Sequence, residues 1–401
     1  MPVNRLYYDD PYLVRFTATL TASAEYDGQP AVALDCTAFY PEGGGQPADH
    51  GTLAAAIVLD VQERDGEVWH ILDRPINLPA GAVVEGEIDW GRRHDFMQQH
   101  HGQHLLSAAF EELLGATTVS VHMGEEICTL DLDRPALEFS EAMAAEELTN
   151  EIIWENRPIQ ARFVDEQELR SLPLRKQPSV DGPIRIVSVQ GFDHSPCGGT
   201  HPRRTGEVGS VVIRRWERRG QTTRVEFICG RRALHDYRRK NTILSAAASS
   251  LSVAAAELPE AIRRLRQAEE TSRKALWKAQ EQLLAYEAAE LVAGAAELPS
   301  GARIVTATFA GRSPEQVRLL ARLIGERGAI ALLGLRGETA QLIFSRPPQL
   351  ALDVGALLRE AVIIVGGRGG GRPEFAQGGG PDVEQLDRAL EHARRSAEVR
   401  L

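Results

Sequence analysis

The sequence contains little cysteine, few aromatic residues and no long apolar run. Four cysteines in 401 residues are too few for a disulfide scaffold and favour a reducing compartment. No apolar stretch approaches the roughly 20 residues of a membrane-spanning helix, and residues 1–8 lack the apolar core of a signal peptide. We therefore expect a cytoplasmic protein with no membrane partner.

Basic residues are outnumbered by acidic ones, 45 Lys and Arg against 56 Asp and Glu, so the formal net charge is −11. This argues against nucleic acid as a partner of the whole surface. The distribution is uneven, however, since residues 202–240 hold twelve Arg or Lys residues against four acidic ones. Such a segment is either a solvated surface or a patch that binds a polyanion, and the pattern leaves both readings open.

Four segments of different pattern follow one another and together predict an α+β protein. Residues 1–90 read as short strands separated by Gly and Pro, which predicts a small β-barrel-like domain. Residues 91–240 combine helices with strands, and residues 241–297 read as a helical linker. Residues 298–401 alternate strands and helices, as an α/β domain does.

One row of residues in the linker follows alternating spacings of three and four. The row consists of Ile262, Leu265, Glu269, Ser272, Leu276, Ala279, Leu283 and Tyr286. This imperfect heptad seam predicts a helical hairpin or a coiled coil that joins two copies of the chain. A single amphipathic helix lying on its own domain is the alternative.

Two pairs of residues have the spacing of metal ligands. His100 and His104 stand four residues apart, so a helix places both on one face. Cys197 and His201 form a second pair around two glycines, which let the backbone fold tightly. Thiolate and imidazole suit zinc, and the Cys/His₃ set predicts one tetrahedral Zn²⁺ site per chain.

Two neighbours of these ligands bear on the chemistry. His101 stands where zincin proteases carry a Glu, so the sequence does not support protease chemistry. Because His101 lies about 100° around the helix from His100, we expect it outside the ligand set, beside the ligands or facing solvent. Asp193 is close enough in sequence to Cys197 to orient a ligand imidazole.

Four ordered motifs resemble those of a known family. Residues 39–46 (FYPEGGGQ), 97–106 (MQQHHGQHLL) and 197–201 (CGGTH) resemble the three signatures of the editing domain of alanyl-tRNA synthetase and of its freestanding relatives, the AlaX proteins. Residues 366–380 (GGRGGGRPEFAQGGG) resemble the glycine-rich signature of the DHHA1 domain, which closes these synthetases and the long AlaX form. The resemblance covers nearly the whole chain and indicates a long, DHHA1-bearing AlaX protein.

The resemblance implies roles for the editing pocket. It assigns zinc to the four residues named above and places a glycine-rich loop close to the pocket, where it binds substrate. That loop consists of Gly43, Gly44, Gly45 and Gln46. His122 stands where synthetases have a pocket Gln, and Gln103 stands where they often have Thr, so both are expected to contact substrate or direct water.

The glycine-rich segment near the C-terminus has a separate implied role. We expect residues 366–380 to form a loop that contacts tRNA phosphates through backbone amides and guanidinium groups. The expected tRNA-binding residues are Arg368, Gly369, Gly370 and Arg372. By resemblance this domain holds the body of tRNA, and a homodimer would form through the linker or this domain.

The reaction implied by the resemblance is hydrolysis of mischarged tRNA(Ala), with Ser-tRNA(Ala) as first substrate and Gly-tRNA(Ala) as second. Four protein ligands fill a zinc tetrahedron, and filled sites are usually structural. The sequence thus favours a zinc that shapes the pocket, with one loose ligand as the alternative. A tRNA-binding module with a purely structural zinc, or threonyl-type tRNA editing, are the competing functions.

Overall fold

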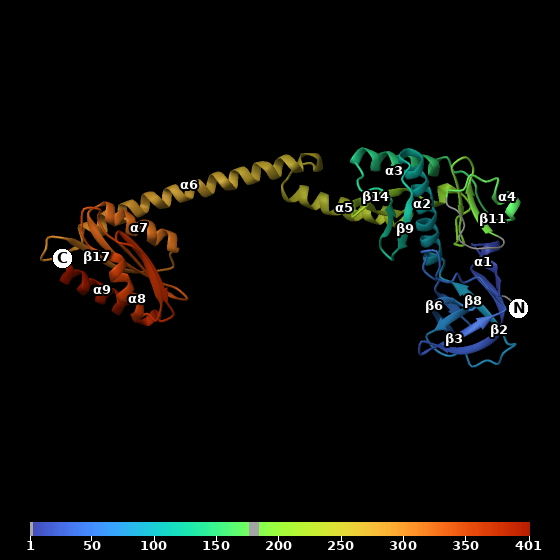
Figure 1. Cartoon of the computed structure of the whole chain (residues 1–401), viewed down its shortest axis with the longest axis horizontal. Helices are drawn as coiled ribbons and strands as arrows, with labels where there is room; N and C mark the ends of the chain where they lie inside the picture. Colours follow the sequence, from blue (N-terminus) through green and yellow to red (C-terminus); the bar gives the residue numbers. More distant parts are fainter. Residues whose placement is uncertain (1–2, 176–183) are drawn as a thin grey trace. The chain divides into compact units, whose positions relative to one another are not determined.

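The computed structural model describes residues 3–175 and 184–401 (Figure 1). The chain divides into two compact units, Met1–Ala247 and Ala248–Leu401. The finer division that the sequence suggests, with boundaries near residues 90, 240 and 297, stays a prediction.

Six strands of the first unit close into a barrel in the order β2-β3-β7-β6-β5-β8. Their bounds are β2 Arg15–Tyr26, β3 Gln29–Leu34, β5 Gly51–Leu53, β6 Ala56–Arg64, β7 Glu67–Leu72 and β8 Val83–Ile88. Every second residue of β8 is buried, because side chains of a strand alternate between the barrel interior and the outside. Leu53, Val58 and Leu72 fill this interior.

Two Asp-Gly turns connect neighbouring barrel strands. Asp27 and Gly28 join β2 to β3, and Asp65 and Gly66 join β6 to β7, with positive φ at all four residues. Two-residue turns of this kind match the right-handed twist of the strands. Beside the barrel, β1 (Asn4–Arg5) pairs in parallel with β4 (Cys36–Thr37), and α1 (Leu6–Asp9) follows β1 directly.

The rest of the first unit is built on a four-stranded antiparallel sheet in the order β14-β15-β10-β9. The bounds are β9 Thr118–Met123, β10 Cys128–Leu132, β14 Val211–Arg219 and β15 Thr222–Cys229. Helices α2 (Trp90–Leu114) and α3 (Phe139–Trp154) bury their apolar faces in one core with this sheet. In that core Phe110 of α2 lies with Leu130 and Phe227 of the strands.

A second, three-stranded sheet completes the unit, in the order β11-β12-β13. Its strands are β11 Ile159–Val164, β12 Ile184–Val189 and β13 Asp193–Pro196, and the short helix α4 (Glu166–Leu169) follows β11. Strand β13 ends at the residue before Cys197.

A buried ion pair ties helix α2 to the barrel. The guanidinium of Arg93 donates from Nε to both carboxylate oxygens of Asp49, at 2.9 and 3.0 Å. It also donates to the carbonyl oxygens of Pro11 (2.7 Å) and Ala38 (2.6 Å). Asp49 in turn accepts from the backbone N–H of Tyr40 at 2.6 Å. Both the guanidinium and the carboxylate therefore have several hydrogen-bond partners, as buried charges require.

The predicted linker is helical in the structure. Helix α5 spans Gly230–Ser250 and α6 spans Leu258–Ala293, with Pro259 in the first turn of α6, where its missing N–H is no loss. The boundary between the two units falls inside α5. Within the described part of the chain, no one helix has both the length and the apolar composition to cross a membrane; α5 taken together with residues 255–293 meets those two criteria only as a bent pair.

The second unit is a six-stranded mixed sheet in the order β16-β17-β18-β19-β21-β20. Its strands are β16 Ala296–Glu297, β17 Arg303–Ala310, β18 Ala329–Arg336, β19 Ala340–Ser345, β20 Arg368–Arg372 and β21 Phe375–Gly380. Helix α7 (Pro314–Glu326) and the end of α6 share one core with the sheet, and α8 (Val354–Ile364) and α9 (Leu386–Arg400) share another. Strand β18 contributes to both cores, with Leu332 in one and Leu333 in the other, as expected for a sheet covered on both faces.

The glycine-rich segment 366–380 is a β-hairpin, and our expectation of a loop was wrong. Strands β20 and β21 pair antiparallel, with Gly369 opposite Gly378 and Arg372 opposite Phe375. A β-carbon on Gly369 would lie 2.5 Å from the Gly378 Cα and 3.0 Å from a methyl carbon of Leu358 in α8. Glycine occurs here because the two strands and the helix approach closely, and most of its backbone amides are engaged in the sheet.

Candidate metal centre

Helix α2 presents two of the predicted ligands from a buried helix. Its start is fixed by Asp89, whose side chain accepts from the Arg92 N–H at 3.1 Å, and its end by Gly115 at φ 62°. His100 and His104 lie one turn apart on the helix and are both buried. Gly102 lies between them, and a β-carbon there would be 2.3 Å from the Cys229 Sγ. The helix therefore lies directly on β15.

Cys197 and His201 lie in the loop that follows β13. Arg185 of β12 shapes this loop, because its Nη1 donates to the carbonyl oxygens of Cys197 (3.0 Å) and Gly199 (2.8 Å). Its own carbonyl accepts from the Cys197 N–H at 3.0 Å. The guanidinium also lies over the ring of Tyr8, 5.1 Å from the centroid. The sequence carried no signal for Arg185 or Tyr8, because neither belongs to a motif.

The structure brings the four predicted ligands together. The ligand atoms of His100, His104, Cys197 and His201 all lie within 4.8 Å of one another. The Cys197 Sγ is 3.3 Å from Nε2 of His100 and 3.3 Å from Nε2 of His201. Tetrahedral zinc bonds of about 2.3 Å to sulfur and 2.0–2.1 Å to nitrogen would place such atoms about 3.5 Å apart. The arrangement therefore fits a zinc ion.

Each histidine of the cluster has a second partner for its other ring nitrogen. Nδ1 of His100 lies 2.7 Å from the amide oxygen of Gln46, and Nδ1 of His104 lies 3.3 Å from a carboxylate oxygen of Asp193. Nδ1 of His201 lies 3.1 Å from Nδ1 of His101. Because Nδ1 is engaged in this way, Nε2 of each ring remains for a metal.

Gln46 ends a tight turn that brings the barrel to the cluster. Gly44 and Gly45 form the turn with φ of 59° and 86°, and Gly43 and Gln46 exchange backbone hydrogen bonds of 3.0 and 3.1 Å. The Gln46 side chain is fully buried and also bonds Thr200 through its Nε2, at 2.8 Å to the hydroxyl. The glycine-rich loop thus lies against the loop of Cys197.

His101 faces inward. Its side chain is completely buried, and its ring lies parallel to the His104 ring with centroids 6.0 Å apart. Its Nε2 is one of three buried side-chain N or O atoms in the described chain that lack a hydrogen-bond partner. A buried N–H without an acceptor costs about 1–3 kcal/mol.

Three stretches of the chain match protein-family models. Residues 12–92 match the family described as tRNA synthetases class II (A), and residues 301–398 match the DHHA1 domain. Residues 184–226, which include Cys197 and His201, match the family described as the threonyl and alanyl tRNA synthetase second additional domain.

Relatives of known name match over long stretches. The alanyl-tRNA editing protein AlaX-L of Pyrococcus horikoshii is 35% identical, over 58% of this chain and 59% of its own length. The alanyl-tRNA editing protein Aarsd1 of Rattus norvegicus is 33% identical, over 56% and 58%. The chain is a homologue of the alanyl-tRNA editing proteins.

This chain is also similar to an alanine–tRNA ligase of Natronomonas pharaonis, at 32% identity over 97% of this chain and 43% of the ligase. The chain spans about half the length of the curated relatives that it matches.

The pKa values of three residues in the Cys/His₃ cluster are shifted far from their usual values. Loss of solvent raises the pKa of the Cys197 thiol, but three neighbouring imidazoles outweigh it and hold this pKa well below its usual value. Burial lowers the pKa of His104, but the Cys197 thiolate and Asp193 raise it to about 9. Burial lowers the pKa of His201 to about 3. A thiolate at Cys197 and a neutral imidazole at His201 are donors that zinc prefers, whereas His104 must lose a proton to bind the ion.

The structure does not bring the predicted water-directing residues into one group. Gln103 is buried beside His104, and its amide nitrogen donates to the Ser107 hydroxyl at 2.7 Å. His122 lies exposed on β9. Among the described residues, no hydrogen bond or ring contact joins His122 to the four ligands.

Most basic side chains of segment 202–240 are paired with acidic side chains. Arg215 bonds Glu226 at 2.8 Å, Arg232 bonds Asp95 at 2.6 Å, and Lys240 bonds Asp236 at 2.6 Å. Paired charges contribute less to a field that attracts a polyanion. The solvated-surface reading of this segment is therefore stronger than the sequence alone suggested.

Proposed function

We propose that the chain is an aminoacyl-tRNA deacylase that hydrolyses the ester between a wrong amino acid and the 3′ end of tRNA(Ala). The supporting observation is the Cys/His₃ cluster into which the glycine-rich turn is hydrogen-bonded through Gln46. Relatives named alanyl-tRNA editing proteins match more than half of the chain, and the family model that covers Cys197 and His201 is described as a threonyl and alanyl tRNA synthetase domain. Since tRNA is charged and used there, the cytoplasm is the proposed location.

One zinc ion per chain is the proposed cofactor, held by His100, His104, Cys197 and His201. When bound, zinc would hold the four side chains that shape the pocket and would supply positive charge that stabilises a developing oxyanion. Four protein ligands complete the tetrahedron, so the residues around the ion carry the positioning. Cys197 is the one ligand residue that is partly exposed, which makes its side of the cluster the proposed approach for the ester.

Gln103 is the residue proposed to discriminate between amino acids. Its amide nitrogen is fixed by Ser107, whose hydroxyl also accepts from the Thr118 hydroxyl at 2.7 Å. With the nitrogen held, the amide oxygen points elsewhere and accepts no hydrogen bond from a described residue. A pocket that hydrogen-bonds the serine hydroxyl can reject alanine by roughly 10⁴-fold. Serine is therefore the proposed first substrate and glycine the second, with His122 as a further contact to substrate or water.

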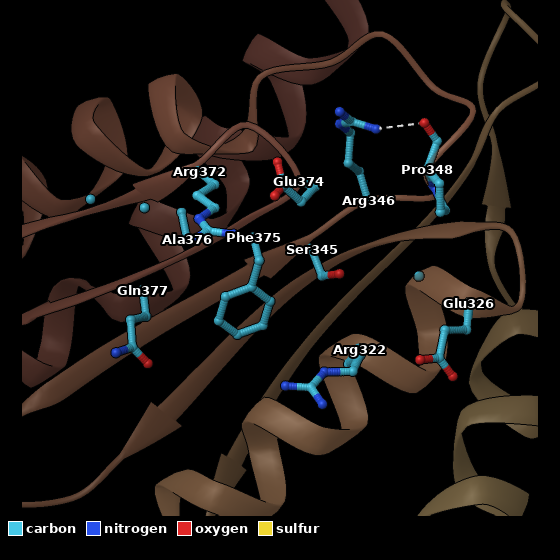
Figure 2. Close-up of a pocket in the computed structure, with 13 residues that line it drawn as sticks. Arg322, Glu326, Ser345, Arg346, Pro348, Arg372, Glu374, Phe375, Ala376 and Gln377 are labelled. Carbon is cyan, nitrogen blue, oxygen red and sulfur yellow. Dashed lines mark hydrogen bonds between the residues drawn. The ribbon is translucent and has the colours of Figure 1, made fainter.

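A cavity in the second unit is the proposed contact for the tRNA body. It measures about 550 Å³ and is lined by Arg322 of α7, Arg346 after β19 and Arg372 of β20. In the view of Figure 2, Arg372 and Arg322 lie on either side of the Phe375 ring, whereas the Arg346 guanidinium is turned toward the Pro348 carbonyl oxygen, to which it donates at 3.0 Å. Arg322 and Arg372 have no acidic partner among the described residues. Two carboxylates, Glu326 and Glu374, also line the cavity, which leaves a net positive lining suited to an RNA backbone and base.

Of the four expected tRNA-binding residues, Gly370 and Arg372 line this cavity. Gly369 packs against α8, and Arg368 lies exposed at the start of the edge strand β20. The proposed contact is thus made by arginine side chains and the hairpin edge, in place of the backbone amides of a loop.

Helix α6 carries the proposed dimer contact. Its seam residues Leu265, Leu276, Leu283 and Tyr286 are each more than half exposed. A row of apolar residues at heptad spacing suits a second copy of the same helix. Leu276→Asp should shift the sedimentation coefficient from dimer to monomer, and a monomeric parent protein would reject the contact.

The proposed reaction is tested by hydrolysis of Ser-, Gly- and Ala-tRNA(Ala) side by side. We expect release of serine to be faster than release of alanine by on the order of 10³-fold or more. Cys197→Ala should lose both zinc and hydrolysis, because the pocket is built around the ion. Equal rates for serine and alanine would reject editing, and full activity of a metal-free variant would reject the role of zinc.

Two alternatives are separated by the same assay. A tRNA-binding module with a structural zinc, to which four protein ligands would also be suited, would bind tRNA(Ala) without releasing any amino acid. Threonyl-type editing would release serine from Ser-tRNA(Thr) in preference to Ser-tRNA(Ala). The family description that covers residues 184–226 names both synthetases, so the threonine substrate belongs in the assay.

A further inference from the structure

His101 is not one of the four metal ligands, yet its imidazole is fully buried in contact with the cluster. Its Nδ1 lies 3.1 Å from Nδ1 of His201, and Nε2 of His201 lies 3.3 Å from the Cys197 Sγ. The two nitrogens of the His201 ring thus face different partners. One faces the cluster, and the other faces His101.

The proton positions follow from this geometry. A metal needs the lone pair of His201 Nε2, so the ring proton of His201 sits on Nδ1. That N–H then donates to the lone pair of His101 Nδ1. The proton of His101 is consequently on Nε2, which is buried and has no acceptor.

An unpaired buried N–H makes histidine a poor choice for packing alone. A leucine or phenylalanine would fill the same space without leaving a polar atom unpaired. A side chain with a hydrogen-bond acceptor is needed here because it can accept from the Nδ1–H of His201. The other two ligand rings have such partners as well, in Gln46 and Asp193.

We infer that His101 is a positioning residue for the metal centre, which holds His201 in the metal-binding tautomer and ring orientation by accepting its Nδ1–H. Partners of this kind typically contribute 10- to 100-fold to metal affinity. The inference rests on the proposed metal centre and not on the proposed hydrolysis.

The test compares His101→Leu with His101→Asn. Leucine fills the space without an acceptor, whereas the asparagine oxygen can lie where His101 Nδ1 lies. Zinc affinity is measured on the full chain by competition with a chromophoric chelator, and the ligand geometry is followed by the absorption spectrum of Co²⁺. We expect the leucine variant to bind zinc about 10- to 100-fold more weakly with an altered Co²⁺ spectrum, and the asparagine variant to keep both.

A matched control and a stability measurement separate positioning from packing. His94→Leu changes another histidine of α2, whose ring centroid lies 5.3 Å from that of Trp90 and outside the cluster, and should leave zinc affinity unchanged. Urea unfolding of the metal-free variants should show the leucine variant about as stable as the parent, because the unpaired His101 N–H is removed while the His201 Nδ1–H loses its acceptor. Zinc affinity of His101→Leu equal to that of the parent would overturn the inference. So would an asparagine variant that is folded but binds zinc as weakly as the leucine variant. A parent protein that binds no zinc would instead reject the metal centre itself.

Discussion

At the scale of single residues, the cluster requires a glycine at position 199, because a side chain there would displace the ring of His100. Gly199 lies against the ring of His100, and a β-carbon there would be 2.1 Å from the His100 Cε1 and 2.9 Å from the Gln46 amide oxygen. Its neighbour Gly198 is different, because a β-carbon there would meet only the Tyr8 hydroxyl, at 3.5 Å. The two adjacent glycines therefore serve different purposes.

Gly199→Ala should weaken zinc binding by about tenfold or more, because the methyl group displaces a ligand ring together with its Gln46 partner. Gly198→Ala should bind zinc like the parent, since ordinary contact distance is kept. Chelator competition on both variants checks this. If the two substitutions lower zinc affinity equally, the close approach of Gly199 to His100 is not what matters.

The protonation of His104 predicts how zinc binding depends on pH. Cys197 and Asp193 outweigh burial and raise the pKa of His104 to about 9 in the metal-free site, so the imidazole carries a proton at pH 7. Zinc must displace this proton, whereas the lowered pKa of the Cys197 thiol favours the thiolate that binds the ion. The apparent affinity should therefore rise about tenfold per pH unit up to pH 9 and level off above it.

Zinc titrations from pH 6 to 10 measure this slope. Asp193→Asn removes one cause of the raised pKa, so the levelling should move to lower pH in that variant. An affinity that does not change between pH 7 and 9 in the parent would show that His104 is already neutral.

At the scale of elements, the position of helix α2 relative to the barrel decides whether Gln46 can reach His100. The Arg93–Asp49 pair fixes this position, with both side chains at most 3% exposed. Removal of one partner leaves a buried charge without compensation. Backbone groups add to this junction: the carbonyl oxygens of Pro11 and Ala38 accept from Arg93, and the Tyr40 N–H donates to Asp49.

Asp49→Ala should lower the free energy of unfolding of the first unit by about 3–5 kcal/mol. Urea unfolding followed by circular dichroism measures the change. Glu87→Ala is the matched control, because Glu87 forms an exposed pair with Arg15 on the same barrel and exposed pairs contribute little. Equal effects of the two substitutions would mean that the junction does not depend on the buried pair.

At the scale of the whole molecule, the cluster and the arginine-lined cavity belong to different units. The first unit has cores of its own, in the barrel and around α2. If each unit holds one part of tRNA, their linkage raises affinity without adding a contact.

Residues 1–247 alone should hydrolyse a mischarged acceptor-stem minihelix at the rate of the full chain. Their affinity for full-length tRNA(Ala) should fall on the order of 100-fold, because one of two linked sites is lost. Arg372→Ala in the full chain should reproduce part of this loss, and Arg327→Ala, outside the cavity, should not. Filter binding of tRNA gives the affinities, and unchanged affinity of the shortened chain would exclude a role of the second unit in binding.

The sequence by itself determined the elements and the ligand set. The spacing of His100 and His104 on a helix, with Cys197 and His201 around two glycines, was enough to predict the cluster, because these contacts are local within each pair. The helical linker and the alternation of strands and helices in the second unit also followed from periodicity. The glycine-rich segment 366–380 was misjudged, since local rules take glycine for a loop and cannot register the close approach of α8.

The sequence predicted Asp193 as a partner of a ligand imidazole, and the resemblance placed Gln46 near the pocket; only the tertiary structure decided which ligand each contacts and added Arg185 and the contact of His101. Gln46, His101, Arg185 and Asp193 come from four separate segments, and their hydrogen bonds to the cluster form only when the barrel, α2 and the two sheets pack together. His101 could not be placed inside or outside from sequence, because a helix position fixes a direction but not what lies there. The physical reason is general: a ligand pair depends on spacing along the chain, whereas the partner of a ligand depends on contacts across it.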